Sequence, residues 1–135
     1  MPADIFWKHI KEKWQPASEE QLRGAAHAVL FHLRRRLPHE EVQALFSELP
    51  GEVVGLSFDV AYLKEFPARR HPPERHQDAP EFFSTVGREA SLSEDDAARA
   101  TEAIFGAMKQ ELPAKQINAV HAMLPKQLGE VWSRA

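Results

Sequence analysis

Hydrophobic residues along this chain recur at steps of three and four, the spacing that places them on one face of an α-helix. In the first half this pattern predicts helices over residues 3–14, 18–37, 38–49 and 50–56. Ser18 is a predicted N-cap, and Gln21 is placed to complete a capping box with it. Proline suits the first position of a helix, so Pro38 and Pro50 are predicted to begin the third and fourth helices.

The second half repeats this order at an offset of 75 positions. Two Leu-Pro pairs carry the register, since Leu37-Pro38 recurs as Leu112-Pro113 and Leu49-Pro50 recurs as Leu124-Pro125. At the same offset Ser18 falls on Ser93, and upstream a shift of 76 aligns Phe6-Trp7 with Phe82-Phe83. A fixed internal period indicates duplicated supersecondary units. We therefore predict an all-α fold of about eight helices, in two tandem four-helix repeats that pack with a pseudo-two-fold relation.

The two repeats are expected to form one domain, because a unit of this size has too little core to be stable alone. The predicted organisation is repeat one over 1–66, a linker over 67–79 and repeat two over 80–135. The linker is rich in proline, histidine and arginine, and its prolines exclude a regular helix, so we expect an extended surface segment. Residues 58–66 are unusually apolar and are interpreted as a helical extension rather than a strand-like segment.

A longer pattern carries a family resemblance. From Ala25 to Pro50 the chain reads Ala-x-x-Ala-Val-Leu-Phe-x-Leu-x-x-x-Leu-Pro-x-x-Glu-Val-x-x-Leu-x-x-x-Leu-Pro. This pattern, and its second copy from Phe82 to Trp132, resembles the bacterial domain-of-unknown-function family 2267. The resemblance implies an all-helical fold and brings no activity, cofactor or catalytic residue with it. The chain departs from the pattern in its long linker and in His121, which stands where the first copy has Phe46.

Composition excludes several classes of protein. The chain has 135 residues, no cysteine and a formal net charge of -3. Without cysteine there are no disulfides, thiolate nucleophiles, thiolate zinc sites or iron–sulfur clusters. No apolar run is long enough to cross a membrane, and the start of the chain lacks a signal-peptide pattern. We expect a cytoplasmic protein with no membrane partner.

The sequence contains no motif that identifies an enzyme. The six glycines are scattered and form neither a phosphate loop nor a dinucleotide fingerprint. Neither Glu-x-x-His nor His-Glu-x-x-His occurs, so the common metal sites of helical bundles are not predicted. His27 and His32 are five residues apart and point to different helix faces, while His71 and His76 fall in the linker. We predict no cofactor, no metal and no catalytic residue.

Two candidate sites remain. One is a basic patch for anions or nucleic acid, formed if the linker folds back on the first repeat; it comprises Arg34, Arg35, Arg36, Arg69, Arg70 and Arg75. Against it, the overall charge is negative, and arginines at a helix end are ordinary partners of the helix dipole. The other is a small-ligand or metal site between the repeats, near Tyr62 and His121.

Large apolar residues lie beyond the main helical stripes. Trp7, Trp14 and Phe31 are predicted to form the seam between the repeats, with an exposed partner site as the alternative. The leading hypothesis is a non-enzymatic helical scaffold or interaction protein whose partner is another protein. Nucleic-acid binding and a ligand site between the repeats are the alternatives, and a homo-oligomer is compatible with all three.

Overall fold

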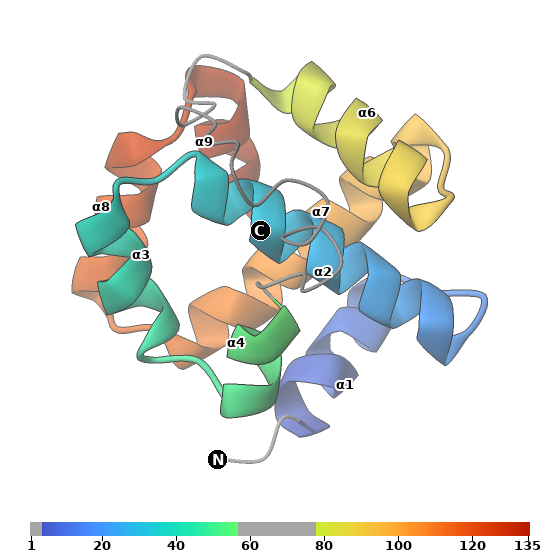
Figure 1. The fold of residues 1–135 in the computed structure, drawn as a ribbon, viewed down its shortest axis with the longest axis horizontal. Helices are drawn as coiled ribbons and strands as arrows, with labels where there is room; N and C mark the ends of the chain where they lie inside the picture. Colours follow the sequence, from blue (N-terminus) through green and yellow to red (C-terminus); the bar gives the residue numbers. More distant parts are fainter. Residues whose placement is uncertain (1–3, 57–77) are drawn as a thin grey trace, which may run out of the picture.

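The computed structural model describes residues 4–56 and 78–135, and within these ranges every regular element is an α-helix (Figure 1). The described residues form eight helices: α1 (Asp4–Lys13), α2 (Glu19–Arg35), α3 (His39–Phe46), α4 (Gly51–Leu56), α6 (Ala79–Ala90), α7 (Glu94–Glu111), α8 (Ala114–Met123) and α9 (Lys126–Arg134). The predicted all-α class is confirmed. The predicted helix over 58–66 and most of the predicted extended linker over 67–79 lie outside the described residues.

Three helices of the second half begin 75 residues after their counterparts in the first. The starts of α2 and α7, of α3 and α8, and of α4 and α9 are separated by 94 − 19, 114 − 39 and 126 − 51. The starts of these helices therefore repeat at the 75-residue offset that the Leu-Pro pairs indicated. The pseudo-two-fold relation between the halves stays a prediction.

Helix starts are fixed by local chemistry at corresponding positions. The hydroxyl oxygens of Ser18 and Ser93 each accept the backbone N–H three residues on, at 3.1 Å. Gln21 closes a variant of the capping box, because its side-chain oxygen accepts the N–H of Ala17 at 2.7 Å rather than that of Ser18. The prolines stand one position earlier than predicted: Pro38 and Pro113 are extended N-caps, with ψ of 150° and 155°, so their helices begin at the next residue.

The first helix of each half packs on the second helix of the other half. α1 lies against α7, and α6 lies against both α2 and α7, which also contact each other (Figure 1). A single hydrophobic cluster therefore contains buried residues from both halves, including Ile10 of α1 and Ile104 of α7. Because of this packing, part of the buried surface of each half is covered by a helix of the other half.

The large aromatic side chains mostly fill the core. Trp14 and Phe31 are buried and Trp7 is half-buried, while their assignment to a seam between the repeats stays a prediction. In the second half the rings of Phe82, Phe105 and Trp132 join α6, α7 and α9, with centroids 6.0 Å apart for the first pair and 5.2 Å for the second. The indole N–H of Trp132 donates to the carbonyl of Ile117 at 3.0 Å, which satisfies its only polar atom inside the core.

Polar groups from other helices hold α9 at both ends. The carboxylate of Asp78 accepts the N–H of Ala79 at the start of α6 and also those of Gln127 and Leu128 at the start of α9. At the other end the Lys109 ammonium donates to the carbonyls of Trp132, Ser133 and Ala135. Because helix ends leave backbone groups unpaired, these contacts supply the caps that the α9 sequence lacks.

Candidate functional site

The predicted arginine group divides at the C-terminal end of α2. Arg34 and Arg35 lie in the last turn of α2 and are half-buried, whereas Arg36, its C-cap, is buried with 1% of its surface exposed. Arg69, Arg70 and Arg75 lie outside the described residues. Convergence of the six arginines on one surface therefore stays a prediction, and Arg36 faces the core.

Arg36 is held by contacts that a surface anion site would not need. Its Nη1 donates to the carbonyl of His32 at 3.0 Å, and its guanidinium lies over the ring of Phe82, 4.8 Å from the centroid. Phe82 belongs to α6, so this cation–π contact ties the end of α2 to the other half of the chain. A planar guanidinium can be buried in this way because it stacks on an aromatic face while its N–H groups donate at the edge.

A second polar contact joins the same two helices. The Nε2 atom of His32 lies 2.6 Å from a carboxylate oxygen of Glu89 on α6. His32 is buried and Glu89 is the more exposed partner, with side-chain exposures of 6% and 29%. Together with Arg36, this pair places ionisable groups at the α2–α6 contact, with His32 and Arg36 buried and Glu89 at the surface. Their placement between two helices indicates a role in holding the halves together.

The remaining arginines of α2 also have structural contacts. Burial lowers the pKa of the Arg34 guanidinium below its ordinary value, since desolvation disfavours the charged form. Lys109, the residue that caps α9, stands 75 positions after Arg34 (109 − 34). The guanidinium of Arg35 lies 5.7 Å from the centroid of the Phe31 ring. Lys109 and Arg35 thus both make contacts within the protein that stabilise its fold.

Only part of the predicted site between the repeats lies among the described residues. His121 is exposed on α8, and Tyr62 lies outside the described residues. Phe46, the counterpart of His121 in the first half, is buried. His121 is therefore tolerated in place of an apolar residue because its side chain is exposed to solvent. It does not occupy the core position that the repeat predicts.

Metal-binding groups are not gathered anywhere in the described ranges, where no three or more His, Asp or Glu side chains are placed to hold an ion. His27 is half-buried on α2, and His32 is engaged with Glu89. No helix within residues 4–56 and 78–135 has the length and apolar character that a bilayer span requires.

The outer side of α1 carries a surface groove at its junction with α2. It is lined by residues of both signs around one tryptophan: Asp4, Trp7, Lys8, Lys11, Glu12, Gln15 and Glu19. One ion pair crosses the junction, because the Lys11 ammonium donates to a Glu19 carboxylate oxygen at 2.6 Å. That hydrogen bond and the positive charge of Lys11 lower the pKa of Glu19 below its ordinary value.

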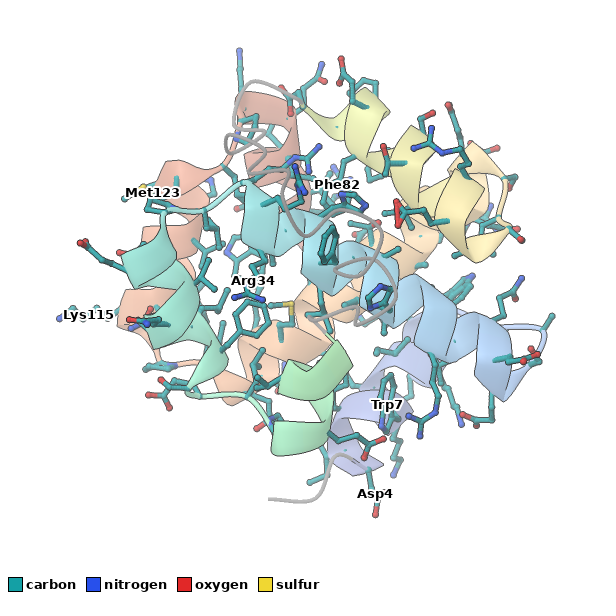
Figure 2. All side chains as sticks on the ribbon, in the orientation of Figure 1. Asp4, Trp7, Arg34, Phe82, Lys115 and Met123 are labelled. Carbon is teal, nitrogen blue, oxygen red and sulfur yellow. The ribbon has the colours of Figure 1, made fainter. Side chains whose placement is uncertain are left out.

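Trp7 lies at the boundary between this groove and the core. Its ring contacts that of Phe6 edge-on, with centroids 5.2 Å apart, and the guanidinium of Arg23 lies 5.4 Å from the Trp7 ring. Arg23 is held by Glu52 of α4 at 2.9 Å. The indole N–H of Trp7 is covered, and no acceptor for it is found among the residues that the structure describes. Figure 2 shows Trp7 on α1, and Ile5, on the same helix, is 57% exposed.

The comparison with family models gives one match over nearly the whole chain. The model is described as "Uncharacterized conserved protein (DUF2267)" and matches residues 3–131. A search of the curated proteins finds no match to this chain.

Proposed function

The chain belongs to the DUF2267 family, and from its geometry we propose that it is a non-enzymatic interaction protein that binds another protein through α1. The observation that carries the proposal is the pair of apolar side chains that α1 leaves accessible beside a charged groove. Ile5 is more than half exposed and Trp7 is half-buried, although Phe6 and Ile10 already supply the buried face of the helix.

Aromatic side chains of this kind supply much of the binding energy in protein interfaces. Tryptophan is enriched among interface hot spots, where a large ring is desolvated on binding, and the rim of an interface is polar. Trp7 has that setting, since Lys8, Lys11 and Glu12 line the same groove.

The second half offers a natural comparison for this surface. At the 76-residue shift, Trp7 corresponds to half-buried Phe83, and Ile5 corresponds to exposed Glu81. The first helix of repeat two thus has a ring at the same position, without an indole donor and with a charge in place of the isoleucine. The exposed isoleucine and the indole ring, which favour binding, are therefore found on α1 and not on α6.

Site-specific photo-crosslinking tests the proposal in cells. A photoreactive phenylalanine analogue replaces Ile5 in one variant and Glu81 in a matched control. We expect a protein crosslinked from position 5 but not from position 81, and loss of that product when Trp7→Ala is added but not when Phe83→Ala is added. Equal products from both positions, or products indifferent to Trp7, would contradict the proposal.

A bacterial cytoplasmic accessory role is part of the proposal. It is supported by the absence of cysteine, which fits a reducing compartment, and by the bacterial family that the Leu-Pro pattern resembles. Fractionation of cells expressing the untagged chain checks the location, and recovery outside the cytosolic fraction would contradict it.

A further inference from the structure

Helix α8 is the least embedded of the longer helices. Of its ten residues only Val120 is buried, with Ile117 partly covered. The outer side consists of exposed residues of modest size and one flexible apolar side chain: Lys115, Asn118, His121, Ala122 and Met123. Figure 2 shows Lys115 and Met123 extending outward from α8 at the edge of the molecule. Met123 is 43% exposed, and methionine adapts readily to a partner surface.

The neighbouring helix α3 has the opposite charge. α3 and α8 pack side by side (Figure 1), one from each half of the chain. α3 has Glu40 and Glu41 in its first turn and no lysine or arginine, and Glu48 follows its end. α8 has no acidic residue, and Lys115 near its start is followed by Lys126 just beyond its end.

These charges have no ion-pair partner in the described part of the chain, residues 4–56 and 78–135. Among the described residues, no ion pair includes Glu40, Glu48, Lys115 or Lys126, and all four side chains are exposed. One acid or base thus lies near or just beyond each end of each helix.

We propose that the α3–α8 face binds a second copy of this chain, with α3 of each copy on α8 of the other. A two-fold axis that runs parallel to the two helices but lies outside the α3–α8 face, in the plane between the two copies, would place the α3 of each copy against the α8 of its partner, an isologous arrangement. Glu40 and Glu48 of one copy would then face Lys115 and Lys126 of its partner, and the same contacts would recur on the other side. Ala122 and Met123 supply the apolar contact between them.

Sedimentation velocity on the intact chain, with charge-reversal variants, tests this arrangement. One variant combines Glu40→Lys with Glu48→Lys, and a second combines Lys115→Glu with Lys126→Glu. All four positions are exposed, so folding should be unaffected, and circular dichroism checks it. Lys13→Glu combined with Arg88→Glu is the control for a change in net charge, because both residues are exposed and lie on α1 and α6 rather than on α3 or α8.

We expect dimers of the unaltered chain at roughly 20 mM salt that weaken at roughly 500 mM, as screened charge pairs do. Each double variant alone should raise the dissociation constant at least about tenfold, since like charges then face each other. Mixing the two double variants should restore a dimer, because each α3–α8 contact again joins opposite charges. The control that combines Lys13→Glu with Arg88→Glu should dimerise as the unaltered chain does.

Three results would overturn the proposal. One is a monomer at low salt across the concentration range of the centrifuge. The second is a dimer whose dissociation constant is indifferent to both double variants. The third is failure of the two mixed variants to associate while each is folded and monomeric alone.

Discussion

Asp78 supports the strongest quantitative prediction, because one carboxylate caps two helices. Its Oδ1 accepts the N–H of Ala79 at 2.8 Å and that of Leu128 at 2.7 Å, and its Oδ2 accepts the N–H of Gln127 at 3.1 Å. The N-cap of α9 is Pro125, which has no side-chain hydrogen bond of its own. Asp78 therefore supplies the polar contact at the start of α9 from 50 residues away.

Asp78→Ala removes both caps at once. Loss of an N-cap costs about 1 kcal/mol for α6, and two charge-assisted bonds at the start of α9 add about 1–3 kcal/mol after allowance for partial exposure. The expected loss in the free energy of unfolding is thus about 2–4 kcal/mol, a large share of the roughly 5–15 kcal/mol of a typical domain. Asp78→Asn keeps an acceptor oxygen but loses the charge, and should cost about 1 kcal/mol.

Urea unfolding followed by circular dichroism at 222 nm measures these differences, with equal slopes required of all variants. Asp95→Ala is the matched control: Asp95 is exposed in the first turn of α7, where Ser93 already caps the helix, so a change within about 0.5 kcal/mol is expected. A loss below about 0.5 kcal/mol for Asp78→Ala would refute the double cap.

Three further changes follow from packing and backbone geometry, each measured by the same unfolding assay. Gly24→Ala should stabilise by about 0.5–1 kcal/mol because an added Cβ meets nothing within 4 Å, whereas Gly87→Ala should destabilise because that Cβ would lie 2.7 Å from the Leu92 carbonyl oxygen. Equal signs for the two would contradict this account. Ser91 caps α6 with φ of 58°, so Ser91→Gly should stabilise by about 1 kcal/mol, and a loss would show that its side chain matters more than the strain. Leu33→Ala should cost about 2–5 kcal/mol because Leu33 is fully buried, and an unchanged midpoint would exclude it from the core.

The sequence predicted the helices well because their boundaries depend on local chemistry. The caps at Ser18 and Ser93 and the stops at Leu-Pro are set by a few neighbouring residues, and the structure places helix starts within one residue of each. Burial of Leu33 and Ile104 follows from helical spacing alone. These features can be predicted without knowing which helices pack against each other.

The partners of each helix could not be predicted in this way. Periodicity identifies the buried face of α1 but does not distinguish α2 from α7 as its neighbour. Arg36 was expected near solvent and is buried, because Phe82 of the other half covers it. Likewise Asp78 caps a helix start some 50 residues away, a contact that local pattern cannot indicate.

The candidate surface on α1 was only partly foreseen. Trp7 was assigned with Trp14 and Phe31 to the seam, and the structure buries the latter two. The exposure of Ile5 could have been noticed from its offset against Phe6 and Ile10, since a helix face holding all three would exceed one stripe. The charges of α3 and α8 can be read from the sequence, but only the structure shows that these two helices are neighbours.

The central structural claim is that α1, the first helix of the first half, packs on α7 of the second half. A nuclear Overhauser experiment on the labelled chain tests it directly at the α1–α7 contact, where the His9 ring lies against Gly106; a Cβ added there would be 3.3 Å from its Nε2. The account predicts cross-peaks between the His9 ring protons and the α protons of Gly106. Their absence, together with cross-peaks from the same ring to α2, would show that α1 packs within its own half and would contradict its packing on α7.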